Sequence, residues 1–529
     1  MKYVRLTYIF TLMVLGVSCQ SDFLDREPLD KISSSAVYSD QNLAQAFLNK
    51  IHDEIPHPLG GYYMTDCVTD NARTKSGWIS SQKVIVPGLI GPSNNPIGMW
   101  HKYKSIRKAN EFIEKVGESS MDESFKKTAV AEARWLRAEF YFELVKRYGD
   151  VPLITKAQTI NDDFLTPRTP ATDVWDFIDS ELDEIDDILE SKSDILNGKI
   201  SKEACWALGS RAMLYAKRWE KCVDYSRRVI ESGKFEMSPD YGKLFGSYGG
   251  DKEVIFEILF DGKANKGQSY DLYNLPWSYR ADWGSQTNPT QELVDSYYMA
   301  NGLPITDAAS GYDAKKPYEG RDPRFYASVL YNGAVFKGRA MNTVSPDGPD
   351  AINKTGLHSI TGYYCRKYLD EKSAIAPKGG ESRVSWKMFR LGEMYLNLAE
   401  AENELRPASN TVYASVKVIR DRVNMPNIKP GLSQAEMRKE LMHERRIELA
   451  FEDHRWWDLI RWRKSIEVLD GKYFHGVVVT KNDDGSLNYN MKHVVDNRPL
   501  QVFLEKHYLA PIPYSDIQKN ENLTQNPGY

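Results

Sequence analysis

Apolar residues recur at helical spacing through much of the chain. Leu43, Phe47, Ile51 and Ile55 lie four residues apart, with polar residues between them. Because a helix makes one turn in 3.6 residues, this spacing places the four side chains on one face and predicts an amphipathic helix. Similar stripes predict further helices over 100–113, 131–148, 173–189, 201–235, 386–405, 411–424 and 433–464.

The segment 201–235 contains a more specific pattern. It reads as two helices that break near Lys217 and Arg218, and Trp206, Ser210 and Cys222 occupy the aromatic, small and small positions of a tetratricopeptide-type hairpin. Small residues at these positions let two helices approach closely. We therefore predict a mostly α-helical fold, built as a tetratricopeptide-like scaffold of helical hairpins with long loop-rich insertions and a few short strands.

The insertions are predicted at 56–100 and 236–385. Both stretches are rich in Gly, Pro, Asn and aromatic residues, and short apolar runs such as 254–260 indicate single strands. Long excursions from a rigid scaffold commonly carry binding functions. We therefore expect the functional site in these two regions.

The first residues indicate export. Lys2 and Arg5 precede an apolar run, and small residues precede Cys19, which is the order of a signal peptide. A buried N-terminal strand with a chance cysteine is the alternative. Residues 15–19 resemble the lipobox of bacterial lipoproteins, which implies cleavage before Cys19 and lipid attachment to it.

This reading divides the chain into three parts. Residues 1–18 are the predicted signal peptide, residues 19–38 a lipidated tether, and residues 39–529 a single body. Within that body we expect helical units near 40–55, 99–148, 173–235 and 386–464.

The charge balance excludes one class of partner. The chain has 69 basic and 73 acidic side chains, so its formal net charge is −4. A protein without a basic excess has no general attraction to polyanions. We therefore expect no nucleic-acid partner.

Four cysteines remain after Cys19, namely Cys67, Cys205, Cys222 and Cys365, and no two form a C-x-x-C pair. This spacing does not suggest a zinc knuckle or a redox-active dithiol. Cys205 and Cys222 lie near the starts of successive antiparallel helices, at opposite ends of the predicted hairpin and too far apart for a disulfide. We expect them to be small core residues.

The segment 444–462 concentrates acids, arginines and three tryptophans. His443 and Glu444 begin like a zinc-protease helix, but Ile447 stands where the second histidine ligand is needed. Residues 436–464 contain eight basic and seven acidic side chains, which favours mutual pairing over a charged patch. We predict a structural or partner-facing role here and no metal site.

Aromatic residues stand among polar residues in the two insertions, where we expect ligand contacts. Sugars present apolar C–H faces that stack on rings and hydroxyls that need polar partners. The candidate ligand-binding residues are Trp78, Asp70 and Arg73 in the first insertion and Trp277, Tyr279, Trp283 and Asn288 in the second. The alternative is that Trp277, Tyr279 and Trp283, all at odd positions, form the buried face of a strand.

Several phrases of the sequence resemble the SusD/RagB family of outer-membrane lipoproteins. They lie at 131–153, 289–302, 322–326, 362–368, 444–462, 509–513 and 522–529. The resemblance implies a SusD-like body of four tetratricopeptide-like units at the cell surface. It also implies that the protein is anchored to the outer membrane through Cys19, binds a glycan, and delivers it to a SusC-like TonB-dependent transporter.

Catalysis is not indicated. The sequence has no G-x-S-x-G, Walker or G-x-G-x-x-G motif, and the family resemblance implies binding without turnover. We therefore predict no catalytic residue, no cofactor and no catalytic metal, and leave a structural calcium open. A peptide ligand, as in the RagB branch of the family, is the alternative to a glycan, and a glycoside hydrolase is a more distant one.

Overall fold

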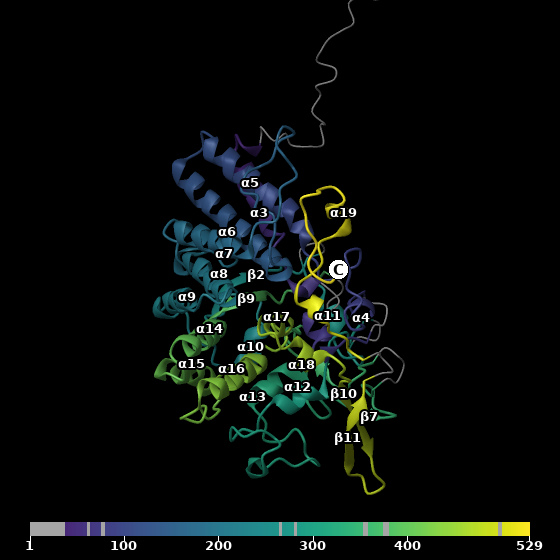
Figure 1. The fold of residues 1–529 in the computed structure, drawn as a ribbon. Helices are drawn as coiled ribbons and strands as arrows, with labels where there is room; N and C mark the ends of the chain where they lie inside the picture. The colour runs from purple at the N-terminus through teal and green to yellow at the C-terminus, as the bar shows by residue number, and fades with distance from the viewer. Residues whose placement is uncertain are drawn as a thin grey trace, which may run out of the picture.

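The computed structural model describes residues 37–60, 64–75, 80–263, 267–279, 283–352, 358–373, 380–495 and 500–529. Helices dominate and the strands are short, which confirms the predicted mostly α-helical class. Figure 1 shows long helices stacked along one side of the molecule, with the loop-rich segments and the short helices on the other side.

The stack is built from antiparallel helices in chain order. Its members are α3 (Gln41–His52), α5 (Tyr103–Glu118), α6 (Glu123–Tyr148), α7 (Ala171–Ile185), α8 (Lys202–Tyr215), α9 (Trp219–Glu231), α14 (Leu391–Leu405), α15 (Asn410–Asp421) and α16 (Gln434–Glu448). Each of the helices α5 to α8 packs on the next, and α14 contacts α9, α15 and α16. The stack therefore continues past the second insertion as if α9 and α14 were neighbours in sequence.

Helix α6 lies inside the stack. The Asp122 side chain accepts from the backbone N–H groups of Ser124 and Phe125, so the helix begins at Glu123, before the predicted residue 131. From Ala131 to Tyr148 nearly every side chain is buried, including polar ones. A helix that is buried on all sides must satisfy its polar groups with neighbouring helices, and Arg137 does so by donating to Glu181 of α7 at 2.6 and 2.9 Å.

The α8–α9 hairpin has the close approach that its small residues predict. The hydroxyl groups of Ser210 and Ser226 are 2.8 Å apart, and the Cys222 thiol points at the Asn397 carbonyl oxygen of α14. A Cβ atom on Gly209 would lie 2.8 Å from the Tyr225 ring. The helices are therefore as close here as a glycine allows.

One predicted helical segment is wrong at its start. Residues Trp386–Arg390 form strand β9, which pairs antiparallel with β2 (Val254–Ile258), and helix α14 begins only at Leu391. The apolar run of β2 offers a partner for main-chain hydrogen bonds, and side chains of Trp386–Arg390 are buried on both faces of the strand. Burial on both faces removes the alternation that would distinguish a strand from a helix in the sequence.

Short elements make up the other half of the molecule. The helices are α4 (Ser80–Val84), α10 (Tyr241–Phe245), α11 (Tyr270–Asn274), α12 (Gln291–Ser296), α13 (Pro323–Ser328), α17 (Arg455–Arg461), α18 (Ser465–Leu469) and α19 (Tyr514–Ile517). The strands are β1 (Ala72–Arg73), β3 (Asn288–Pro289), β4 (Val329–Leu330), β5 (Val335–Phe336), β6 (Arg339–Ala340), β7 (Val344–Ser345), β8 (Tyr364–Cys365), β10 (His475–Lys481) and β11 (Leu487–Val494). Strands β10 and β11 form a hairpin that extends away from the body in Figure 1.

The sequence analysis does not anticipate the β10–β11 hairpin. Its signal is present, since the β-branched run of β10 is followed by Asp484 and Gly485, and Gly485 has a φ of +85°. Three strands make one sheet in the order β11–β10–β7.

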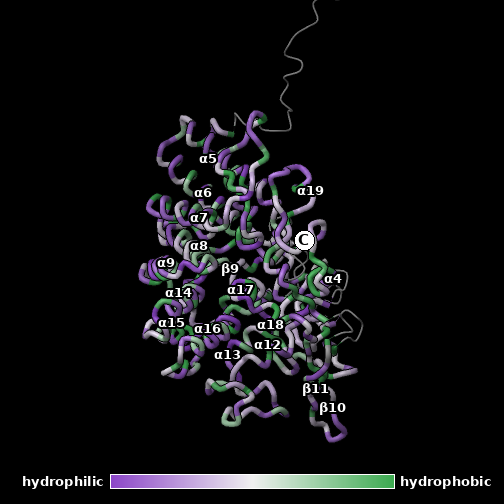
Figure 2. The backbone as a smooth tube through the Cα atoms, in the orientation of Figure 1, coloured by the Kyte–Doolittle hydropathy of each residue, from purple (hydrophilic) through white to green (hydrophobic). Residues whose placement is uncertain are grey.

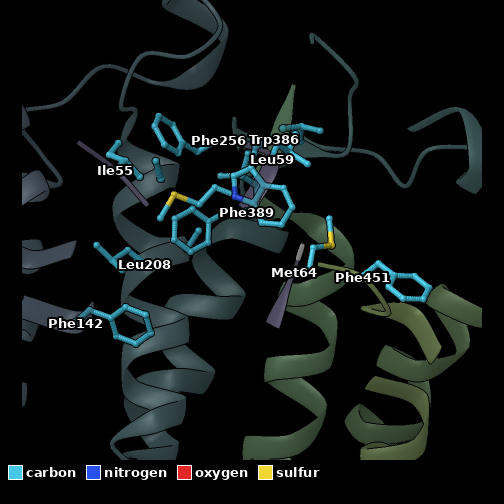
Figure 3. Packing of buried hydrophobic residues seen from close by; sticks show 14 of the residues in the cluster. Ile55, Leu59, Met64, Phe142, Leu208, Phe256, Trp386, Phe389 and Phe451 are labelled. Carbon is cyan, nitrogen blue, oxygen red and sulfur yellow. The ribbon is translucent and has the colours of Figure 1, made fainter. Parts of the chain in front are cut away.

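The main hydrophobic core joins the stack to the loop-rich half. Figure 3 shows Phe256 of β2 and Phe389 and Trp386 of β9 gathered with Ile55 and Leu59 beside the helices. Hydrophilic residues line much of the outer edge of the stack in Figure 2. The β2–β9 pair therefore connects the two halves of the molecule.

Cys67, Cys205, Cys222 and Cys365 are all buried and unbridged. This confirms that Cys205 and Cys222 are core residues. Cys19 and the signal and tether segments lie outside the described residues. Within the described ranges, no helix combines the length and apolar character needed to cross a bilayer.

The charged segment 444–462 is paired inside the protein. Glu448 accepts from three guanidinium groups, those of Arg324 at 3.1 Å, Arg390 at 2.7 Å and Arg422 at 2.6 Å. Glu444 accepts from Arg324 at 2.6 Å and Arg420 at 2.8 Å. The pairs connect α16 to other elements rather than running along the helix, so the segment ties the last helices to the rest of the fold.

These contacts strongly lower the pKa values of Glu444 and Glu448. Burial would raise the pKa of Glu444, but Arg324 and Arg420 outweigh burial and lower it to about 2. The pKa of Glu448 is held well below its ordinary value, because Arg422, Arg390 and Arg324 together outweigh its burial. Both glutamates are therefore ionised at neutral pH.

Candidate ligand-binding surface

A short strand pair brings the two predicted loop regions together. Strand β1 pairs antiparallel with β3, so that Ala72 faces Pro289 and Arg73 faces Asn288. The Thr290 hydroxyl donates to the Asp70 carbonyl oxygen at 2.6 Å. The two insertions, which are more than 200 residues apart in the chain, therefore meet at one place.

The Asp70 side chain is buried beneath this strand pair and forms ion pairs within the protein. It is 5% exposed, and its carboxylate accepts from Arg455 at 2.8 and 2.9 Å and pairs with Arg446 at 2.9 Å. Burial would raise the pKa of Asp70, but the two arginines overcome burial and hold the pKa well below its usual range. An aspartate this fully paired has little capacity left for a ligand.

Arg73 and Asn288 are also committed to the protein. The Arg73 guanidinium donates to the Ala72 carbonyl at 2.9 Å and to Gln501 at 2.6 Å, and lies 4.1 Å from the centroid of the Phe474 ring. The Asn288 side chain donates to the Ser285 carbonyl at 2.7 Å and accepts from the Ile360 N–H at 2.7 Å. Since Asp70, Arg73 and Asn288 are all buried, we assign them to framing the surface and leave them out of the ligand contacts that we propose below.

The predicted rings of the second insertion lie nearer the surface. Residues Trp277 and Tyr279 are partly exposed and occupy a turn rather than the alternative strand, and Trp283 is 46% exposed. The backbone doubles back here, because the Ser285 N–H donates to Leu275 and the Gln286 N–H donates to Tyr273. Because the backbone turns back, the Trp283 ring contacts the Tyr273 ring edge to face, with ring centroids 6.4 Å apart.

Trp277 and Tyr279 are held by residues from other loops. The Trp277 ring lies 4.7 Å from the His358 ring at a tilt of 37°. The Tyr279 hydroxyl donates to the Phe336 carbonyl, and the Arg339 guanidinium lies 4.5 Å from the Tyr279 ring. We call Tyr273, Trp277, Tyr279, Trp283 and Arg339 the aromatic platform.

Polar groups border the platform. The Ser278 N–H and hydroxyl each donate to Asp350 at 2.9 Å, and Arg339 donates to the Ser278 hydroxyl. Burial raises the pKa of Asp350. Rings beside an exposed guanidinium can stack on the C–H face of a sugar and bind its hydroxyls, whereas Asp350 is 1% exposed and holds Ser278 in place.

Trp78 and Cys19 lie outside the described residues, so their predicted roles remain predictions. Arg339, His358 and Asp350 were not among the predicted site residues. They lie 62 to 81 residues further along the chain than Trp277, and no local pattern in the sequence connects them to it. Tyr270, which has the same composition signal as its neighbours, is fully buried.

The described part of the chain contains no cluster of three or more histidine, cysteine, aspartate or glutamate side chains arranged to hold a metal ion. The His443 ring instead stacks on Tyr298 at 4.1 Å and contacts the Ser296 carbonyl oxygen at 2.7 Å. Burial lowers the pKa of His443 to about 4. The imidazole is therefore a neutral, structural group.

Comparisons with known proteins extend over most of the chain. A family model described as the SusD family matches residues 252–529, and one described as starch-binding associating with outer membrane matches residues 22–214. SusD-like protein P38 of Formosa agariphila is 25% identical over 502 residues, which are 88% of this chain and 93% of that protein.

Solved structures agree with these matches. A SusD-like protein of Bacteroides fragilis superposes with a TM-score of 0.80 at 28% identity, covering 95% of this chain and all of the other. A second protein of the same species, described as a SusD-like carbohydrate binding protein, superposes with a TM-score of 0.79 at 25% identity, over 92% of this chain and all of the other.

Proposed function

Because this chain belongs to the SusD family, we propose that it captures an oligosaccharide or polysaccharide at the cell surface and delivers it to a SusC-like TonB-dependent transporter. In this proposal Cys19 carries the lipid anchor in the outer membrane. The protein binds its ligand and does not cleave it.

The observation that carries the proposal is the aromatic platform. Trp283 and the partly exposed Trp277 and Tyr279 lie on one folded loop, and the exposed Arg339 guanidinium provides hydrogen-bond donors beside them. Aromatic surfaces of this kind bind polymer chains without enclosing them, so each contact is modest and repeated contacts along the polymer add avidity. The matched description of starch-binding proteins associating with the outer membrane supports the same ligand class and location.

The helical stack supports the second half of the proposal. Its outer edge is largely hydrophilic (Figure 2), and stacked hairpins present a broad and rigid surface of the kind that suits a protein partner. We propose that this side faces the transporter while the aromatic platform receives the glycan.

Affinity gels containing different polysaccharides test the proposal. We expect retention of the wild-type protein by at least one glycan, and at least tenfold weaker retention for Trp277→Ala, since the substitution removes a stacking face. Trp78→Ala is expected to act in the same direction. Phe164→Ala is the matched control, because Phe164 is 52% exposed but lies beside α5 and α6 in the helical stack.

The same experiment separates the alternatives. If no glycan retains the protein while a peptide mixture does, the peptide-binding alternative replaces our proposal. New reducing ends that appear only with active protein would show hydrolysis and contradict binding without turnover. Unchanged retention of both tryptophan variants would reject the aromatic platform as the site.

A further inference from the structure

A partly open cavity lies where the helical scaffold meets the loop-rich half, apart from the aromatic platform. It has a volume of about 340 Å³ and is bounded by α6, α8, β9, the segments 56–58 and 96–99, and residues 452–457. Pockets for small molecules begin at about 300 Å³, so this cavity has room for one small ligand.

Aromatic and apolar side chains form part of the wall. They are Tyr215 of α8, Trp386 and Met388 of β9, and Trp457 of α17. Trp386, which Figure 3 shows beside Leu59 and Phe389, is 6% exposed, and Trp457 is 3% exposed. The cavity therefore offers ring faces as well as polar groups.

The basic groups of the wall already have partners. Lys146 and Arg147 both pair with Glu143, and Arg211 makes a two-pronged pair with Glu393 at 2.7 and 2.8 Å. Lys146 and Arg147 share the carboxylate of Glu143, and Arg211 has that of Glu393, so every one of these three cations is already engaged with an acid of the protein.

Glu139 differs from these groups. It is 1% exposed and borders the cavity, and its Oε2 atom has no hydrogen-bond partner among the described residues. His57 also borders the cavity, and its Nδ1 atom has no partner there either. A buried polar atom without a partner is unfavourable, so a ligand that gives these atoms hydrogen-bond partners gains binding free energy.

The electrostatics make both groups neutral. Burial, assisted by the charge of Glu143, raises the pKa of Glu139 to about 8, and burial lowers the pKa of His57 to about 4. The ionisable groups that border the cavity or act on Glu139 are Glu143, Lys146 and Arg147 of α6, Arg211 of α8, Lys102, His57, and Glu452, Asp453 and His454. At pH 7 Glu139 is therefore a carboxylic acid that can both donate and accept a hydrogen bond.

From this geometry we propose that the cavity between α6, α8 and β9 is a second binding site, which takes one small uncharged, hydroxyl-bearing ligand such as a single sugar residue. The Glu139 side chain and His57 Nδ1 would bind the hydroxyls, and Trp386 would pack on the apolar face. A free monosaccharide and the terminal residue of a longer glycan present the same hydroxyls and the same apolar face, so the site would accept either one.

Titration calorimetry on the full-length protein tests the site. The probes are D-glucose, D-galactose, N-acetyl-D-glucosamine and maltotriose, each at pH 6.5 and pH 9.5. Glu139 is mostly protonated at the first pH and mostly ionised at the second, so we expect wild-type affinity to fall by roughly tenfold or more if only the protonated form binds. A monosaccharide that binds identifies a free sugar, and binding of maltotriose alone identifies a chain end.

Two variants of Glu139 separate its chemistry from its shape. Glu139→Gln keeps a neutral donor and acceptor, so binding is expected to persist and to lose its dependence on pH. Glu139→Leu removes both functions and should weaken binding at least tenfold. Met99→Trp, at a half-buried residue of the wall, fills the cavity by a different route and should also abolish binding.

Trp277→Ala is the control, because it alters the aromatic platform and leaves the cavity intact. Loss of gel retention with unchanged cavity binding in this variant shows that the two sites are separate, so either proposal can fail without the other. The cavity proposal is overturned if no probe binds at millimolar concentration. It is also overturned if binding is the same in Met99→Trp and in the wild type.

Discussion

At the residue scale, Glu448 shows how buried charges hold this fold together. Its side chain is fully buried and is surrounded by Arg324, Arg390 and Arg422. Glu448→Gln would remove the charge that these guanidinium groups share, and breaking a buried pair typically costs about 3–5 kcal/mol. We expect the free energy of unfolding, measured by urea denaturation, to fall by that amount in Glu448→Gln.

Glu467→Gln is the control for this change. Glu467 pairs with Lys464 on the surface, where its side chain is 68% exposed. Surface ion pairs contribute little to stability, so the unfolding midpoint of Glu467→Gln should equal that of the wild type. Equal midpoints for Glu448→Gln and the wild type would contradict the structural role of the network.

The same network predicts sensitivity to acid. The pKa values of Glu444 and Glu448 are lower in the folded protein than in the unfolded chain. The unfolded state therefore binds more protons at low pH, so the stability from these groups is complete above about pH 4.3 and is lost as pH falls towards 2. Thermal unfolding at pH 7, 4 and 3 should show a falling midpoint, with a smaller fall in Glu448→Gln.

Individual ring positions were only partly predictable. Trp277, Tyr279 and Trp283 stand out in the sequence because rings cluster among turn residues, yet Tyr270 has the same signal and lies in the core. Exposure depends on how the chain returns from Leu275 to Ser285, which is a tertiary property. Burial of Asp70 between two arginines of a distant segment likewise has no local signature.

At the element scale, the α8–α9 hairpin depends on Gly209. A Cβ atom there would lie 2.8 Å from the Tyr225 ring, so Gly209→Ala forces the helices apart. Such overpacking costs about 1–3 kcal/mol, which chemical denaturation would measure.

Gly117→Ala provides the matched control in α5. A Cβ atom on Gly117 meets nothing within 4 Å, so only helix propensity changes. Alanine is favoured over glycine in a helix by up to about 1 kcal/mol, and we expect this variant to be slightly more stable than the wild type. Stabilisation by Gly209→Ala as well would show that α8 and α9 are less tightly packed than described.

The helices of the stack were predictable because each repeats an apolar stripe over several turns. The error at Trp386–Arg390 has a physical cause, since a strand with both faces buried has no alternating pattern. The β10–β11 hairpin was missed although its turn contains Asp484 and Gly485. A long segment with helical spacing therefore identifies a helix more reliably than a short apolar run identifies a strand.

At the scale of the whole molecule, the proposed anchor gives a further test. Cys19→Ala removes the proposed acylation site, so the protein should move from the membrane fraction to the soluble fraction of lysed cells. Ser21→Ala, two residues away, should leave it in the membrane fraction. Membrane retention of Cys19→Ala would contradict the lipid anchor.

The pairing of β1 with β3 also constrains how the molecule matures. Helical hairpins form between neighbouring segments, whereas this ladder waits for residues 72–73 to find residues 288–289 across more than 200 intervening residues. Contacts of such long sequence separation close late, because chain entropy must be lost before they form. We therefore expect the ability to bind ligand to arise at the end of folding, so that partly folded chains bind none.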